Sequence, residues 1–339
     1  MEKRYIIGID QSTQGTKALL FDGVGHLLRR TDLPHRQIVN EKGWVSHDLN
    51  EIYRNTVQTV KTLVAESGVA PETIAGIGIS NQRETTAIWD KATGEPLEEA
   101  IVWQCGRASG IAQEIAEQGH AEEIREATGL QLSAYFPAAK MAWLLRNGGE
   151  ERQKRAADGK LCLGTIDSWL VYKLTGDHAF KTDFSNASRT QLFNLKTLAW
   201  DKKICEMFGI PVCALARVCN SDAVYGATTM EGLFSEPVPI CGVLGDSHAA
   251  LFGQGCLKPG MIKATYGTGS SLMMNIGDKP IKSSHGVVTS LAWGRGGKVD
   301  YVLEGNLNYT GAVITWLKDD LKLISSAKET EGLAGEANP

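Results

Sequence analysis

The sequence contains no pattern that would indicate a membrane protein or a nucleic-acid-binding protein. Among its 339 residues, no apolar run approaches the length of a membrane span, and the first residues show no signal-peptide pattern. The formal net charge is −4, and Lys and Arg do not gather into a basic face, so the charge distribution gives no reason to expect a nucleic-acid partner. We therefore expect a chain without a membrane span and without nucleic acid among its partners.

Disulfide and zinc-site patterns are missing as well. The seven cysteines are scattered and form no C-x-x-C pair, and the seven histidines show no H-x-x-x-H spacing. An odd number of scattered cysteines in a chain of this length is typical of reduced, mostly buried thiols. We therefore expect a cytoplasmic protein without a zinc site.

The composition is that of an ordinary globular protein. Charged residues make up 22% and apolar residues 42% of the chain, which are the proportions of folded domains with a buried core. A length of 339 residues favours two domains over one. One stretch, residues 239–271, contains two candidate functional elements.

The first of these elements is an acidic residue at the end of a predicted strand. The apolar run Ile240–Leu244 indicates a buried strand, and Gly245 allows a sharp turn where that strand ends. Asp246 then stands where a helix over residues 247–253 is expected to begin, a position that favours a carboxylate or an anion. Asp246 is therefore a candidate base.

The second element is a turn rich in glycine and hydroxyl groups. A second apolar run, beginning at Met261, leads into Tyr266-Gly267-Thr268-Gly269-Ser270-Ser271. Such a turn between strands can present backbone N–H groups to a phosphate.

A similar turn lies near the N-terminus. Strands are predicted over Tyr5–Ile9 and Thr16–Phe21, with a polar turn over residues 10–15 between them. A hairpin loop explains this turn equally well when it is taken alone. However, Asp10 at the strand end can hold Mg²⁺ through water while the hydroxyl and N–H groups that follow meet phosphate oxygens. Two such units suggest two related lobes that face one nucleotide.

Two further polar clusters follow buried strands. A strand over Ile74–Ile79 leads into residues 80–86, where Arg83 and Glu84 adjoin; a surface ion pair is the plainer interpretation. Trp103 follows the short run Ile101–Val102, and it can wall a pocket or simply belong to the core. Polar groups at the ends of buried strands are where α/β folds place binding residues.

The remaining predicted elements complete an α/β pattern. Asp48 and Glu51 resemble a capping box at the start of a helix that Gly68 ends. Asp167 is expected to cap a helix over residues 168–174, and residues 183–190 are expected to brace the pocket. We also expect helices over 108–118, 121–128, 138–146, 202–208 and 311–323. Strands are expected over 26–30, 161–165, 287–293 and 299–304, and the last two complete a meander. A polar tail follows over 325–339.

Taken together, the motifs resemble those of the FGGY carbohydrate kinases, and among them most closely the glycerol kinases. The segment Y-F-P-A-A-K-M-A-W-L-L-R-N, from Tyr135 to Asn147, fits the first signature of that family position by position. The motifs that follow the family order are G-I-D-Q-S-T, N-Q-R-E-T-T, I-V-W-Q-C, S-N-A-S-R-T, G-D-x-x-A-A-L-F-G-Q and T-Y-G-T-G, and they span nearly the whole chain.

This resemblance implies an actin-like architecture of two ribonuclease-H-like lobes, with the acceptor alcohol and ATP meeting between them. Lobe I would comprise residues 1–251 and lobe II residues 252–339. Family members are considerably longer than this chain, so the resemblance implies a complete lobe I and a partial lobe II. It also implies a homodimer or homotetramer for the full-length protein.

The resemblance also implies roles for individual residues. Asp246 would be the general base, and Asp10 would position Mg²⁺. Lys17 stands where the family has an arginine, so the charge is kept but the forked geometry is lost. The residues expected to bind ATP phosphates or nucleotide are Ser12, Thr13, Gln14, Lys17, Gly267, Thr268, Gly269 and Gly311.

The acceptor site implied by the resemblance departs from that of glycerol kinases at two positions. Ser247 replaces a glutamine, and Ser271 replaces an aromatic residue that walls the carbon backbone of glycerol. Both changes shorten the side chain, and we infer a roomier, more polar pocket for a longer polyol or a sugar. The expected acceptor-binding residues are Arg83, Glu84, Trp103, Tyr135, Asp246 and Ser247.

The expected function is therefore the ATP-dependent phosphorylation of a hydroxyl group of a polyol or sugar. One alternative is a non-catalytic lobe that binds a sugar without phosphorylating it. Another is an actin-like ATPase that serves as a nucleotide switch, which would have no use for the acceptor residues.

Overall fold

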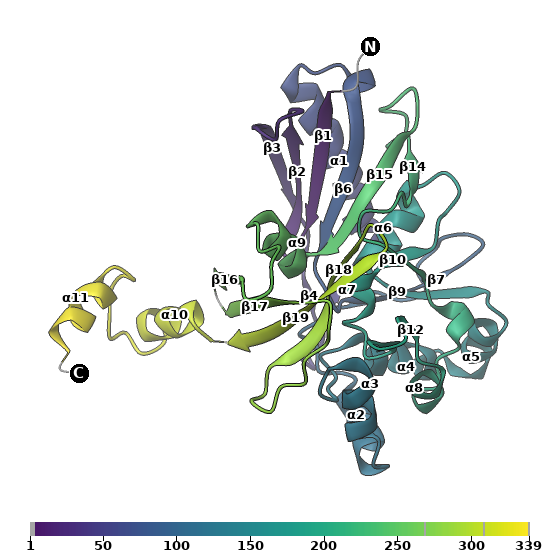
Figure 1. The fold of residues 1–339 in the computed structure, drawn as a ribbon, viewed down its shortest axis with the longest axis vertical. Coiled ribbons are helices and arrows are strands. Elements are labelled where there is room, and N and C mark those ends of the chain that lie inside the picture. The colour runs from purple at the N-terminus through teal and green to yellow at the C-terminus, as the bar shows by residue number, and fades with distance from the viewer. Residues whose placement is uncertain (1–3, 268, 308, 338–339) are drawn as a thin grey trace.

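The computed structural model describes residues 4–267, 269–307 and 309–337 of the chain. Its centre is a six-stranded sheet in the order β14-β15-β6-β1-β2-β3 (Figure 1). Strands β1, β6 and β15 run parallel to one another, while β2, β3 and β14 pair antiparallel with their neighbours. The bounds are β1 (Tyr5–Gln11), β2 (Gly15–Phe21), β3 (Leu27–Pro34), β6 (Ile74–Asn81), β14 (Gly226–Thr228) and β15 (Val238–Gly245).

Helix α1 (Leu49–Ser67) packs along this sheet, and both of its predicted ends are confirmed. Asp48 is the N-cap and accepts a hydrogen bond from the N–H of Asn50, and Gly68 ends the helix at a φ of 71°. Glu51 does not complete a capping box, because its carboxylate accepts the N–H of Arg36 instead. The apolar stripe of the helix is buried against Ile7, Ile9, Ala18 and Leu20 of the sheet.

A second, largely helical region lies below this sheet in Figure 1, around a five-stranded sheet in the order β4-β5-β8-β7-β9. Two short strand pairs, β10 with β13 and β11 with β12, complete the region. Its strands are β4 (Ile38–Val39), β5 (Val45–His47), β7 (Thr86–Asp90), β8 (Ala100–Ile101), β9 (Leu161–Thr165), β10 (Lys181–Asp183), β11 (Phe193–Asn194), β12 (Ala199–Trp200) and β13 (Arg217–Cys219). Its helices are α2 (Ser109–Glu117), α3 (Ala121–Thr128), α4 (Pro137–Asn147), α5 (Gly149–Ala157), α6 (Ile166–Leu174), α7 (Phe184–Ala187) and α8 (Lys202–Met207).

The prediction that Asp167 caps α6 is wrong. Thr165 is the residue before the helix, and Asp167 lies in the first turn, fully buried. Its carboxylate accepts hydrogen bonds from the hydroxyls of Thr165 and Thr182, both at 2.6 Å. The side chain therefore joins the helix to β10, a contact that local sequence does not reveal.

The C-terminal part of the chain forms a four-stranded sheet in the order β16-β17-β19-β18. The predicted meander is therefore wrong, because β19 lies between β17 and β18. Gly296 and Gly297 form the tight turn between the last two strands, with φ of 56° and 77°. Strand β18 lies against α7, and the N–H of Leu291 donates to Oγ of Ser188, which follows that helix. Most residues of β18 are buried, which agrees with its position against α7. The bounds are β16 (Ile262–Tyr266), β17 (Ser270–Gly277), β18 (Val288–Arg295) and β19 (Lys298–Leu307).

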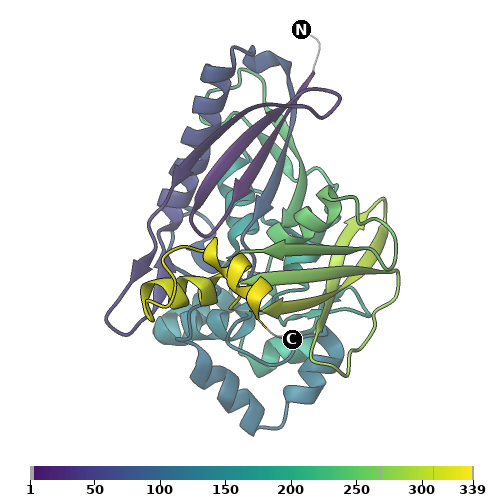
Figure 2. The same ribbon diagram turned by 90° about the vertical axis from the view of Figure 1, so that its left-hand side faces the viewer.

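Two helices at the C-terminus extend away from the rest of the molecule in Figure 1, and they lie in front of it in Figure 2, where this side faces the viewer. Helix α10 (Gly311–Asp319) is shorter than predicted. The polar tail was expected to have no apolar periodicity, and it contains the helix α11 (Glu329–Glu336). The Glu329 carboxylate accepts the N–H groups of Ser325 and Ser326, which stabilises the start of α11 without any apolar stripe. Trp316 of α10 remains 48% exposed.

Within the described residues, no helix is long and apolar enough to cross a membrane. All seven cysteines lie in this part of the chain and have free thiols, and the buried ones are Cys105, Cys162, Cys205 and Cys256.

Candidate active site

Arg83 and Glu84 follow β6 directly, and both side chains are buried rather than forming a surface ion pair. Glu84 has a φ of 60°, a left-handed conformation that costs energy for a residue with a side chain. Strained backbone of this kind gathers at functional sites, so its place at the end of a central parallel strand agrees with a binding role.

A buried ion network surrounds these two residues. Both Nη atoms of Arg83 donate to the carboxylate of Glu304 on β19, at 2.9 and 2.8 Å. Arg189, which follows α7, donates from Nε to Glu84 at 2.6 Å and lies 2.8 Å from Glu304 through Nη1. Because all four side chains are at most 6% exposed, each charge depends on its partners. The network joins the loop after β6 to a strand of the C-terminal sheet.

Sequence analysis missed Arg189 and Glu304 as members of this site. Arg189 lies in residues 183–190, for which only a bracing role was expected. Glu304 lies in the apolar strand segment Y-V-L-E-G, and a lone carboxylate in such a segment signals a buried partner. Burial by itself raises the pKa of Glu304, but Arg189 and Arg83 hold it well below its usual range.

Asp246 is the first residue of helix α9 (Asp246–Gly253) and lies beside Arg83. Its Oδ1 is 3.2 Å from Nε of Arg83 and accepts the N–H of Ser247 at 2.6 Å. Burial raises the pKa of Asp246 and Arg83 opposes this; because 43% of the side chain is exposed, we expect the net rise to be small. Gly245 is needed here, because a Cβ at this position would lie 2.7 Å from Cγ of Arg83.

Trp103 connects the predicted acceptor residues to the first phosphate turn. Its Nε1 donates to Oγ1 of Thr13 at 3.0 Å, and its ring packs edge to face against Tyr135 with centroids 5.7 Å apart. Burial raises the pKa of Tyr135, so its hydroxyl stays protonated at neutral pH. The structure therefore brings Trp103, Tyr135 and Thr13 together.

The first turn is shorter than predicted, because Asp10 and Gln11 belong to β1 and Gly15 begins β2. Asp10 faces Lys17 across this hairpin, and Nζ of Lys17 donates to its carboxylate at 2.9 Å. The hydroxyl of Ser80 donates to the other oxygen of Asp10 at 3.2 Å. The hydroxyl of Ser12 donates to the carbonyl of Gly15, which closes the turn. Gln14 lies at the tip of this turn, and its carbonyl accepts the N–H of His35.

The second turn lies between β16 and β17. The N–H of Gly267 donates to the carbonyl of Gly269, and the N–H of Gly311 donates to the carbonyl of Gly267 at 2.9 Å. The turn thus contacts the start of α10. Thr268, which was also predicted to bind nucleotide, lies outside the described residues.

Strand register places Ser271 on the same face of the C-terminal sheet as Glu304. Ser271 pairs with Asn306 and Met273 pairs with Glu304, and residues two apart on a strand share a face. Within the described part of the chain, Oγ of Ser271 is buried without a hydrogen-bond partner. A buried hydroxyl without a partner is costly unless water or a ligand satisfies it.

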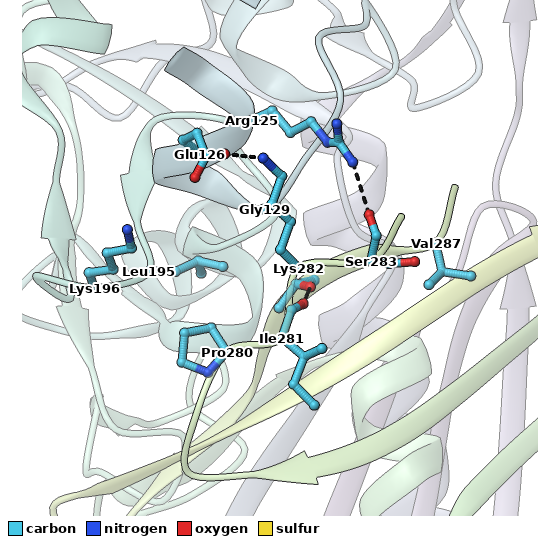
Figure 3. A pocket seen from close by; sticks show the side chains of 11 residues that line it. Arg125, Glu126, Gly129, Leu195, Lys196, Pro280, Ile281, Lys282, Ser283 and Val287 are labelled. Carbon is cyan, nitrogen blue, oxygen red and sulfur yellow. Dashed lines mark hydrogen bonds and ion pairs between the residues drawn. The ribbon is translucent and has the colours of Figure 1, made fainter. Parts of the chain in front are cut away.

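A separate cavity of about 150 Å³ lies between α3 and the segment before β18 (Figure 3). Arg125 donates to the carbonyl of Ser283 at 2.9 Å there, and Lys282 is paired with Glu126. None of the predicted site residues lines this cavity, so it is distinct from the candidate active site.

The comparisons with known proteins agree with this geometry. Residues 5–253 match the N-terminal domain and residues 262–338 the C-terminal domain of the FGGY family of carbohydrate kinases. The chain therefore belongs to the FGGY family of carbohydrate kinases, and its fold is the actin-like two-domain fold of that family.

Individual relatives point to one branch of this family. The chain is 47% identical to glycerol kinase 2 of Thermotoga maritima over 98% of its own length and 66% of that protein's length. The crystal structure of Plasmodium falciparum glycerol kinase with ADP superimposes with a TM-score of 0.90 at 33% identity, covering 99% of this chain and 67% of that one. A xylulose kinase from Rhodospirillum rubrum shares the fold, with a TM-score of 0.86 at 21% identity. That match covers 99% of this chain and 67% of the xylulose kinase. The chain thus spans about two thirds of the length of its relatives.

Proposed function

We propose that this chain binds a polyol or sugar and is the part of an ATP-dependent kinase that holds the catalytic base. The observation that supports this most directly is the arrangement of Asp246, Arg83 and Glu84 at the ends of the parallel strands β15 and β6. Three hydrogen-bonding side chains that converge there suit an alcohol with several hydroxyl groups. A nucleotide switch would have no need of them.

The proposed reaction transfers the γ-phosphoryl group of ATP to an acceptor hydroxyl. Asp246 accepts the proton of that hydroxyl as its oxygen bonds to phosphorus and the bond to the leaving ADP breaks. Glu304 engages both Nη atoms of Arg83, and Nε of Arg83 lies 3.2 Å from Oδ1 of Asp246, so Arg83 can orient the proposed base. Alignment of this kind supplies much of the catalysis in phosphoryl transfer.

The phosphates of ATP would lie between the two turns. Ser12, Thr13 and Gln14 form the first turn with Lys17 beside it. Gly267 and Gly269 belong to the second turn, and Gly311, which begins α10, contacts it. Thr268, which lies outside the described residues, is proposed to bind nucleotide from its position in the sequence. Asp10 would hold Mg²⁺ through water. Its two oxygens each accept one hydrogen bond, from Lys17 across the hairpin and from Ser80 of β6, which leaves lone pairs for metal-bound water. Mg²⁺, when bound, neutralises charge on the β- and γ-phosphates.

The acceptor is proposed to be longer than glycerol, because Ser247 and Ser271 both have short side chains and Oγ of Ser271 has no hydrogen-bond partner among the residues that the structure describes. Ser271→Phe is expected to weaken binding of four- to six-carbon polyols roughly tenfold or more, since a ring would fill their space. Glycerol should be affected much less. Calorimetric titration of polyols from three to six carbons measures this, with Ser271→Ala as the control that removes the hydroxyl alone. Comparable turnover of glycerol and poor turnover of longer polyols by the unsubstituted protein would contradict the proposal.

The function is tested by ATP-dependent phosphorylation across a panel of polyols and ketoses, glycerol included. A phosphorylated product identified by mass spectrometry supports the kinase. Sugar binding without any product from this chain favours the alternative of a non-catalytic sugar-binding lobe. If the chain neither binds a polyol or sugar nor forms a phosphorylated product, both the kinase and the sugar-binding lobe are excluded. We also propose that the protein is cytoplasmic and forms a homodimer or homotetramer.

A further inference from the structure

Lys140 of helix α4 is a cation buried in the interior, with a relative exposure of 0%. Its Nζ donates to the backbone carbonyls of Glu84 at 3.3 Å and Trp103 at 3.2 Å, and also to the carbonyl of Tyr135. An ammonium group has three N–H donors and no acceptor, so these three carbonyls use its whole capacity. Its neighbours in α4, Ala139 and Met141, are buried and apolar.

The three carbonyls belong to segments that are far apart in the sequence. Each segment presents one of the side chains predicted to bind the acceptor, namely those of Glu84, Trp103 and Tyr135. Hydrogen bonds from a charged donor are stronger than those between neutral groups, and they hold loops in one arrangement. Because its three donors are taken up by backbone oxygens, Lys140 has no donor left for the acceptor.

A charge in this place is costly for folding. Burial lowers the pKa of Lys140 to about 7, and the nearby carboxylate of Glu84 acts in the opposite direction. An apolar side chain of similar length would avoid the cost of desolvation, but it would leave three carbonyls without a donor and without a common anchor.

We propose that Lys140 is a positioning residue that clamps the three acceptor-binding segments to one another through a single ammonium group. The inference rests on the proposed function insofar as Glu84, Trp103 and Tyr135 bind the acceptor. The clamp itself is a property of the backbone and can be tested without any substrate.

The test compares Lys140→Met with the unsubstituted protein in two measurements. Amide hydrogen exchange is expected to become roughly tenfold faster in residues 82–86, 102–105 and 133–137 together, because a charged hydrogen bond is lost from each. The dissociation constant for the acceptor, measured by calorimetry, is expected to rise roughly ten- to hundredfold, while that for ATP changes less than twofold. Leu145→Ala on the same helix is the control: it removes buried methyl groups and lowers the melting temperature without either effect.

Other outcomes are equally decisive. Unchanged exchange in the three segments, or an acceptor affinity within twofold of the original, overturns the clamp. If Lys140→Met fails to fold, amide hydrogen exchange in the unsubstituted protein tests the clamp instead. Clamped segments must open together and exchange with one rate. Separate exchange rates for the three segments would contradict the proposal. If the unsubstituted protein binds no polyol or sugar, the proposed function is overturned. The hydrogen-exchange measurement would still test the clamp.

Discussion

Asp246→Asn is expected to slow phosphoryl transfer by roughly 10²- to 10⁴-fold, the usual contribution of a general base. Asparagine keeps the shape of the side chain and can still accept the N–H of Ser247, but it cannot take a proton from the acceptor. Arg83 and Glu84 remain in place, so acceptor binding should change only a few-fold. Initial rates of ADP release, measured with the best acceptor of the panel, give the first quantity, and calorimetry gives the second.

The matched control for this substitution is Asp48→Asn. Asp48 also lies at the start of a helix, and its side chain caps α1 by accepting the N–H of Asn50. Asparagine caps helices about as well as aspartate does, so rates and stability should both be preserved. An Asp246→Asn variant that kept more than a tenth of the original rate would exclude Asp246 as the base.

Glu304→Gln is expected to have the largest effect on stability. The substitution leaves Arg83 and Arg189 buried without their shared carboxylate, and breaking a buried ion pair in this way typically costs about 3–5 kcal/mol. The affinity for the acceptor should fall as well, because Arg83 loses the partner that orients it. Chemical denaturation gives the free energy of unfolding, and calorimetry gives the affinity.

The exposed pair of Glu114 and Arg146 supplies a comparison. Their side chains are 45% and 44% exposed, and solvent-exposed pairs contribute about 0–1 kcal/mol. Glu114→Gln should therefore change the free energy of unfolding by about 1 kcal/mol or less. Equal effects of Glu304→Gln and Glu114→Gln would show that the buried network does not stabilise the protein.

Much of the fold could be predicted because it depends on local patterns. The capped helix α1, the strands that end at Asn81 and Gly245, and the glycine-rich turns all follow from residues close together in the sequence. The order of the C-terminal strands could not be predicted, because β18 in its outer position is held by contacts with residues far away in the sequence, namely Gly129, Ser188 and Ser221.

The predicted site residues remain predictions, although the structure brings several of them together. Asp246 could be identified because it directly follows a buried strand, and Arg83 and Glu84 were assigned to the acceptor site by the resemblance of the motif N-Q-R-E-T-T to that of the family. The two partners that orient them could not be identified in this way, since Arg189 is 105 residues from Glu84 and Glu304 is 221 residues from Arg83. Long-range pairing of charges leaves no periodic signal in a single sequence.

The distance along the chain between Arg83 and Glu304 has a consequence for biosynthesis. A nascent chain acquires both arginines long before residue 304 is added, and until then neither guanidinium can be paired with that carboxylate. Before that, Arg189 has Glu84 and Arg83 has Asp246 as its nearest possible partner, and the carboxylate that both arginines share is still missing. We therefore expect the buried network to become complete only when β19 docks.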